Sequence, residues 1–195
     1  MYETDNYPYI AAKYQLRGRT REVDLIVIHS TESLEVEGGA HATAIYFQDP
    51  PRAGSSHYVV DDKETYQCVY DSNTAAGAVG ANQNGLHIEQ CGRAEQDKAE
   101  WDDDYSKAEI ERAADIAAQL CLKFNVPPVH LTDTALASGA KGIVGHDAVT
   151  RVAKMQGKPN TGHWDPGPNY DWDYFTSCLQ ASYQRRQAAS DSANS

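Results

Sequence analysis

The sequence is poor in basic residues. It carries 17 Lys and Arg against 28 Asp and Glu, and its formal net charge is −11 at pH 7. Proteins that bind nucleic acid normally present a basic face to the phosphate backbone, and segments that dock on anionic lipid are basic as well. The charge balance therefore argues against a nucleic-acid partner and against electrostatic docking on a membrane. A neutral or cationic target is easier to approach.

Long apolar runs are missing too. No segment approaches the roughly 20 apolar residues of a transmembrane helix, so we expect no membrane insertion. The N-terminal stretch MYETDNYPYIAAKYQLRGRT lacks the basic start, the apolar stretch and the small-residue cleavage site of a signal peptide. We therefore expect a protein that is made and folded in a cytoplasm, whether it acts there or elsewhere.

Closely spaced cysteines are also absent. The four cysteines, Cys68, Cys91, Cys121 and Cys178, lie far apart and form no C-x-x-C motif of the kind found in zinc knuckles and redox sites. Free cysteine is among the most frequently buried residue types. We expect four reduced thiols, most of them buried.

Length and apolar content predict one folded domain. A chain of 195 residues with 41% hydrophobic residues suits a single core. Short apolar or alternating runs typical of strands lie at 23–30, 55–62, 64–70, 86–92 and 142–146. The second and third of these runs are separated by a short polar turn, which predicts a hairpin.

Two segments have helical patterns. Residues 40–48 predict a short helix, and apolar residues recur at helical spacing across 106–124. Ser106 and Glu109 have the spacing of a capping box at the start of the second helix. Because strands and helices alternate, we expect an α/β fold with a central mixed β-sheet flanked by helices.

The ends of the chain differ from its middle. Residues 1–22 form a polar, tyrosine-containing lead-in that we expect to pack on the domain, and residues 22–180 contain the predicted strands and helices. Residues 181–195 are mostly small and polar, which predicts a flexible tail or the start of a linker.

Three residues have the chemistry of a metal site. His29 lies near the end of the most apolar strand, His146 ends the run GIVGH, and Asp165 lies in the proline-restricted segment HWDPGP. Two imidazoles and one carboxylate, with a fourth position open to water, are typical of catalytic zinc. The three residues form no local spacing motif, so the alternative that they are scattered residues with other roles stays open.

Five segments resemble a known family. DLIVIHST, SSHYVV, LHIEQCG, GIVGHD and HWDPGPNYDW occur in the order seen in zinc N-acetylmuramoyl-L-alanine amidases. That family includes phage lytic amidases (endolysins), bacterial amidases that recycle wall fragments, and the related peptidoglycan recognition proteins. The resemblance covers roughly residues 22–176. It implies the family's fold, a zinc cofactor, and His29, His146 and Asp165 as the zinc ligands.

The same resemblance implies two catalytic residues. Glu89 matches a glutamate that acts as general base or orients the water at the zinc. His163 falls where relatives often carry a Lys that stabilises the oxyanion, and a histidine N–H can donate in the same way.

Two further residues are weaker candidates for substrate binding. His87 lies two residues before Glu89 and so faces the same side of a strand, while Trp164 stands between His163 and Asp165. An interior packing role is the alternative for both. His57 is family-like, but a packed or hydrogen-bonded role is the favoured interpretation.

The resemblance implies a lytic enzyme of phage type. It would hydrolyse the amide between the lactyl group of N-acetylmuramic acid and L-alanine, acting as a monomer on the cell wall after release through a holin-made hole. The expected partner is peptidoglycan or a muropeptide. The alternatives are a cytoplasmic amidase that recycles anhydro-muropeptides, a peptidoglycan-binding module that does not cut, and a zinc hydrolase acting on another amide.

Overall fold

The computed structural model of the chain describes residues 4–51 and 53–193. Residues 1–3 of the expected lead-in and 194–195 of the expected tail lie outside the described residues. The strands are β1 (Gln15–Leu16), β2 (Leu25–Ser30), β3 (Tyr58–Val60), β4 (Thr65–Gln67), β5 (Thr74–Ala75), β6 (Gly85–Gln90) and β7 (Gly142–Gly145). The helices are α1 (Gly39–Tyr46), α2 (Asp104–Phe124), α3 (Asp133–Ala137), α4 (His146–Met155) and α5 (Trp172–Ala193).

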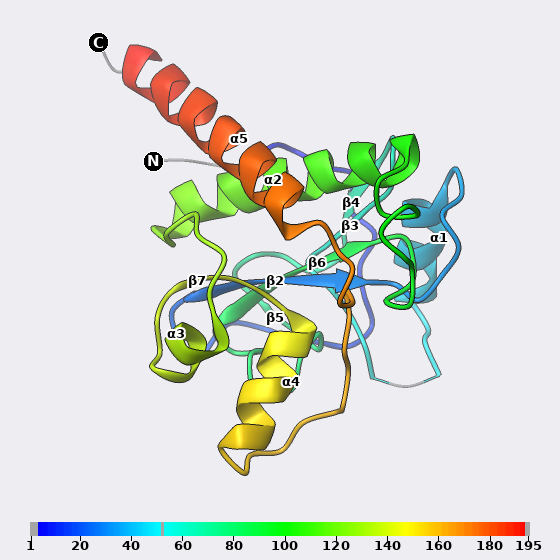
Figure 1. Cartoon of the computed structure of the whole chain (residues 1–195), viewed down its shortest axis with the longest axis vertical. Helices are drawn as coiled ribbons and strands as arrows, with labels where there is room; N and C mark the ends of the chain where they lie inside the picture. The colour runs from blue at the N-terminus through cyan, green and yellow to red at the C-terminus, as the bar shows by residue number, and fades with distance from the viewer. Residues whose placement is uncertain (1–3, 52, 194–195) are drawn as a thin grey trace.

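A five-stranded mixed sheet forms the centre of the molecule, in the order β4-β3-β6-β2-β7. Strands β3, β6, β2 and β7 run parallel to one another, and β4 pairs antiparallel with β3 as the predicted hairpin. Helices α2 and α5 cover one face, and α3 and α4 lie on the other side (Figure 1). The expected α/β fold with a mixed sheet flanked by helices is confirmed.

Side-chain alternation gives the two faces of the sheet different contents. Ile26 and Ile28 of β2 join the core cluster that contains residues of α2 and α5. Leu25 and Val27, which alternate with them, join a second cluster with residues of α4. His29 continues this second series, so its side chain lies on the α4 face of the sheet.

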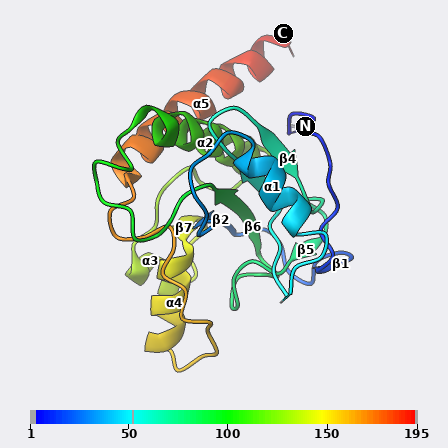
Figure 2. The same ribbon diagram turned by 90° about the vertical axis from the view of Figure 1, so that its right-hand side faces the viewer.

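Helix α1 covers the other end of that second face. Ala40 and Ala44 pack against Val59 of β3 in a third buried cluster. Seen from the side, α1 and α4 stand apart, with the ends of β2 and β6 between them (Figure 2).

The start of α2 differs from the predicted capping box. The cap is Asp103, whose side chain accepts a hydrogen bond of 2.8 Å from the backbone N–H of Ser106, and the helix begins at Asp104. Ser106 therefore lies inside the first turn. Glu109 is fully buried, and neither of its carboxyl oxygens has a hydrogen-bond partner within the described residues. The capping-box interpretation was wrong because an aspartate three residues earlier fills the same role.

The predicted flexible tail is helical as far as Ala193. Phe175 and Leu179 of α5 are buried in the core cluster that contains α2, and the helix continues past that contact. Arg186 binds Asp5 and Asp115, with nitrogen–oxygen distances of 2.8 and 2.6 Å. These ion pairs also fix the lead-in to the domain. Because Gln, Ala and Arg favour helix, the anchored helix extends into a segment that looked unstructured.

All four cysteines are free thiols, and only Cys178 among them is incompletely buried. Burial raises the pKa of Cys68, Cys91 and Cys121 to about 12. Among the described residues, no helix combines the length and apolar character that a membrane crossing requires.

Candidate metal centre

The carboxyl ends of two neighbouring parallel strands bring His29 and His146 together. His29 is the fifth residue of β2, and His146 follows directly on β7, which pairs with β2. Loops at this edge of a parallel sheet are where α/β proteins usually place their sites. Gly145 makes the turn into α4, and a Cβ there would lie 2.3 Å from an oxygen of Asp147.

Asp165 reaches the same point from the loop before α5. Its carbonyl accepts a 2.9 Å hydrogen bond from the backbone N–H of Asp147, which ties the loop to the first turn of α4. Two residues on, Gly167 has φ +103°, and a Cβ there would lie 2.0 Å from the carbonyl oxygen of Ala94. The turn therefore requires glycine and packs directly on backbone.

The donor atoms of these three residues converge. Each offers one ligand atom, and these atoms all lie within 4.8 Å of one another. Nδ1 of His29 is 2.9 Å from Asp165 Oδ2, and Nδ1 of His146 is 3.3 Å from Asp165 Oδ1. All three residues are buried.

This geometry suits a small divalent ion. Tetrahedral zinc with bonds of about 2.0–2.2 Å places its ligand atoms roughly 3.3–3.6 Å apart, close to the observed separations. Neither nitrogen of His146 makes a hydrogen bond within the described residues, although both are buried. A metal ion satisfies such an orphaned nitrogen, since buried polar atoms normally have a partner. The residues present therefore fit a metal.

The protonation states also suit ligands, because metal binding needs neutral histidine and ionised carboxylate. Burial lowers the pKa of His146. Burial acts against ionisation of Asp165, but the adjacent imidazoles of His146, His163 and His29 outweigh it and hold the pKa of Asp165 well below its usual range.

Glu89 lies beside this centre. It is the register partner of His29 on the neighbouring strand β6, and both residues line the same cavity. Its Oε2 is buried without a hydrogen-bond partner in the described part of the chain. Burial, and then the charge of Asp165, raises the pKa of Glu89 well above its ordinary range. A buried carboxyl group with a raised pKa is suited to accepting and returning a proton.

His163 forms the outer wall of the centre. Its ring stacks on that of His146 at 4.6 Å, and its Nδ1 is 3.3 Å from Asp165 Oδ1. Interaction with Asp165 raises the pKa of His163, and the charge of Glu89 adds to the effect. The side chain is half-exposed and lines the cavity, so it is placed to meet a bound molecule.

The two weaker candidates, His87 and Trp164, are not among the residues that line this cavity. His87 does share the face of Glu89, but it is fully buried and lies behind His29 instead of lining the cavity. Trp164 is about half exposed and is not among the residues that line the cavity. A role in substrate binding stays a prediction for both residues. His87 is covered by the segment after β5, and alternation along a strand carries no information about such cover.

His57 has the packed role that the sequence favoured. It is fully buried, its Nδ1 accepts a 3.0 Å hydrogen bond from the backbone N–H of His87, and the two rings stack at 5.6 Å. Arg19 lies on its other side, with one guanidinium nitrogen 2.7 Å from His57 Nε2.

A cavity of about 780 Å³ opens above the centre. Its lining includes the exposed apolar side chains of Leu34, Val36, Tyr46 and Val79. Sequence reasoning treated these segments only as loop and helix, because it had no means of telling which of them border one cavity.

Glu32 is a cavity residue that the sequence did not single out. It has φ +59°, and its Oε1 accepts a 3.0 Å hydrogen bond from the backbone N–H of Ala94. A non-glycine residue in this region is strained, and such strain often marks functional segments. The available signal was its place in the loop that follows His29.

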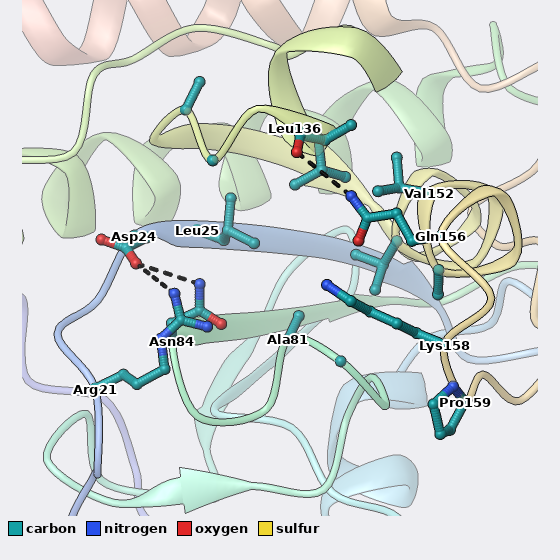
Figure 3. A pocket seen from close by; sticks show the side chains of 16 residues that line it. Arg21, Asp24, Leu25, Ala81, Asn84, Leu136, Val152, Gln156, Lys158 and Pro159 are labelled. Atoms are coloured by element: carbon teal, nitrogen blue, oxygen red, sulfur yellow. Dashed lines mark hydrogen bonds and ion pairs between the residues drawn. The ribbon is translucent and has the colours of Figure 1, made fainter.

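A second, smaller cavity of about 230 Å³ lies at the opposite end of the strands. Leu25, at the start of β2, and Leu136 and Val152 of the α3–α4 region line it, and Asp24 accepts from Arg21 and Asn84 at its edge (Figure 3). No histidine or cysteine is among its lining residues. The imidazole ligands that the proposed zinc site needs thus lie at the first of these two cavities.

Comparison with known proteins gives a family and a shared fold. The sequence profile described as N-acetylmuramoyl-L-alanine amidase matches residues 19–168, which is more than half of the chain. No curated protein matches in a sequence search.

Several solved structures are similar. The hydrolase AmiA of Staphylococcus aureus, solved with its ligand, is 18% identical at a TM-score of 0.66, over 95% of this chain and 87% of that chain. The amidase LysC of Clostridium intestinale is 13% identical at a TM-score of 0.60, over 91% and 99%. A mutant endolysin from Bacillus subtilis is 18% identical at a TM-score of 0.56, over 90% and 99%. At these identities the likeness shows the fold.

Proposed function

We propose that this chain hydrolyses peptidoglycan with a zinc ion held by His29, His146 and Asp165. The chain belongs to the N-acetylmuramoyl-L-alanine amidase family and is an enzyme that acts on peptidoglycan. The bond cleaved is the amide between the lactyl group of N-acetylmuramic acid and the L-alanine of the stem peptide. The single observation that carries the zinc assignment is the convergence of three buried donor groups on one point, beside a cavity large enough for a muropeptide fragment.

Zinc in this position supplies Lewis acidity, which polarises a carbonyl oxygen and makes water a nucleophile near neutral pH. His29 and His146 bind as neutral imidazoles, and Asp165 contributes the one negative charge. The net charge of the occupied centre is then positive, which favours the developing oxyanion of an acyl-transfer reaction.

Glu89 moves the proton. Its carboxylate takes a proton from the attacking water and delivers it to the nitrogen of the leaving L-alanine. Its buried position beside His29 supports this role, because a carboxyl group with a raised pKa both accepts and returns a proton easily.

His163 stabilises the oxyanion. Interaction with Asp165 raises the pKa of His163, which favours the protonated ring, and its half-exposed side chain borders the cavity. A charged N–H donor placed at the mouth of the centre is worth most where negative charge develops in the transition state. Here a histidine takes the position of the lysine that relatives often carry.

The biological role we propose is bacterial cell lysis of the phage type, with the cell wall as the site of action. The likeness to an endolysin fold supports it, as does the broad cavity bordered by exposed apolar side chains. The alternative role is that of an amidase that recycles soluble wall fragments. Both roles use the same chemistry, so only the preferred substrate distinguishes them.

The test is mass analysis of products from purified sacculi and from soluble anhydro-muropeptide, with zinc-loaded protein. We expect free stem peptides that begin with L-alanine, lost in Asp165→Ala. A preference for sacculi supports lysis, and a preference for the soluble substrate supports recycling. Binding to sacculi without cleavage by the zinc-loaded protein contradicts the enzymatic assignment and leaves a peptidoglycan-binding module.

A further inference from the structure

We propose that His87 is a positioning residue for the metal centre: its Nδ1 accepts a hydrogen bond from Nε2 of His29 and holds that ring with Nδ1 turned towards Asp165. The two nitrogens are 3.0 Å apart, and both side chains are buried. The inference rests on the proposed metal site, and it assigns a role to a residue that does not line the cavity.

The direction of the hydrogen bond follows from the ligand geometry. Nδ1 of His29 faces Asp165, so this nitrogen must carry a lone pair when it binds a metal. A neutral imidazole then has its only proton on Nε2, and Nε2 becomes a donor. The atom that receives this proton is Nδ1 of His87, which in turn must be unprotonated. A histidine ligand commonly donates its second N–H to a fixed acceptor in this way.

This hydrogen bond to Nδ1 leaves the other ring nitrogen of His87, Nε2, in an unfavourable position for stability. With Nδ1 accepting, the proton of the neutral ring lies on Nε2, and this atom is buried without a hydrogen-bond partner in the described residues. A buried unsatisfied donor destabilises a fold, and natural proteins keep few of them. An apolar residue of similar size would avoid the cost. The retained histidine therefore points to a role in function.

The surroundings of His87 are shaped to keep its ring in one orientation. His57 stacks on it and accepts from its backbone N–H. On the other side, a Cβ at Gly77 would lie 2.6 Å from Nδ1 of the His87 ring. Only glycine leaves room there, so the small-residue segment after β5 allows the ring to reach His29. The ring of His87 is therefore packed against both His57 and the backbone at Gly77, which favours the observed orientation of its acceptor.

Two substitutions of similar size separate the acceptor from the packing. In His87→Asn, the side-chain oxygen can occupy nearly the position of Nδ1, whereas His87→Leu fills the space without an acceptor. The zinc dissociation constant, measured by competition with a chromogenic chelator, is expected to rise about 10–100-fold in His87→Leu. His87→Asn is expected to stay close to the wild type. Wild-type affinity in His87→Leu overturns the proposal, as does equal weakening in both variants.

A spectroscopic test uses the wild-type protein and does not depend on the folding of a variant. Long-range ¹H–¹⁵N correlation spectra of the zinc-loaded protein report which nitrogen of each histidine carries the proton. We expect the Nε2–H form for both His29 and His87. A proton on Nδ1 of His87 overturns the proposal.

Asp165→Ala distinguishes failure of this inference from failure of the proposed function. If the wild type binds zinc, Asp165→Ala does not, and His87→Leu binds like the wild type, the metal site stands and the role of His87 is refuted. If the wild type binds no zinc, the proposed metal site and the role of His87 fail together.

Discussion

The two ends of strand β2 are built from opposite chemistry. At its carboxyl end, His29 meets His146, Asp165 and Glu89 beside the larger cavity. At its amino end, Leu25 packs in an aliphatic cluster beside the smaller one. One strand thus serves a reactive site at one end and ordinary packing at the other.

The polar groups at the two ends differ in how completely they are paired. Near the amino end, Asp24 accepts from Arg21 and Asn84 and lies 3.0 Å from Lys141, and among the described residues Oδ1 of Asn84 is buried without a hydrogen-bond partner. Near the carboxyl end, both nitrogens of His146, Nε2 of His87 and Oε2 of Glu89 are buried and have no hydrogen-bond partner in the described part of the chain. Unsatisfied buried groups lower stability, and functional sites are where proteins tolerate them. The carboxyl end thus holds more unpaired buried groups than the amino end, which fits the proposed role of the carboxyl end in binding and catalysis.

The largest effect is expected from Glu89→Gln. This substitution keeps the size of the side chain but removes the proton acceptor, so kcat should fall about 10²–10⁴-fold. Zinc affinity and melting temperature should change little, because Glu89 is not one of the three donors. Steady-state kinetics and a zinc titration on the same preparation measure both. Activity near that of the wild type would refute the proton-transfer role.

His163→Gln should reduce kcat about 10²–10³-fold, the usual cost of losing one oxyanion donor. Since Asp165 raises the pKa of His163, the ring is protonated below that raised value and loses its proton as the pH rises through it. The wild-type rate should therefore fall on the alkaline side. In His163→Lys, kcat should be much higher than in His163→Gln. The decrease in rate at alkaline pH should occur at a higher pH than in the wild type. An unchanged pH profile in that variant contradicts the role.

At the amino end of β2, Leu25→Ala should lower the stability of the protein and leave its catalytic activity unchanged. Loss of a buried leucine side chain lowers the free energy of unfolding by about 2–5 kcal/mol. The folded enzyme should keep the kcat/KM and zinc affinity of the wild type. Urea denaturation gives the free energy of unfolding. Steady-state kinetics and a zinc titration, both at urea concentrations below the unfolding transition, give kcat/KM and zinc affinity. A loss of zinc affinity would mean that the two ends of β2 are coupled.

The smallest effect is expected from Glu109→Gln in helix α2, and it concerns the pH dependence of stability. Burial, and then the charge of Glu35, raises the pKa of Glu109 well above its ordinary range. The raised pKa favours the neutral carboxyl in the folded state, whereas in the unfolded chain the group ionises above pH of about 4.3. Its stability contribution is therefore complete at low pH and is lost as the pH rises towards the raised pKa. The variant should be more stable than the wild type at pH 8 and similar at pH 4. Equal pH dependence would contradict this account.

Sequence patterns located the elements that carry the centre. The apolar run before His29, the run GIVGH and the rigid segment around Asp165 each have a local signature, and the parallel sheet brings their ends together. Burial of His87 and the position of Glu32 at the cavity were not predictable, because both depend on which loops cover the sheet. The helical end of α5 was missed because Arg186 finds its partners in remote segments, at Asp5 and Asp115.

The central claim is that a metal ion binds at the carboxyl end of β2. Anomalous diffraction at the zinc edge from crystals of zinc-loaded protein tests it most directly. We predict one strong peak within bonding distance of Nδ1 of His29, Nδ1 of His146 and the carboxylate of Asp165. No peak at this position, or a peak only elsewhere on the molecule, would contradict the account.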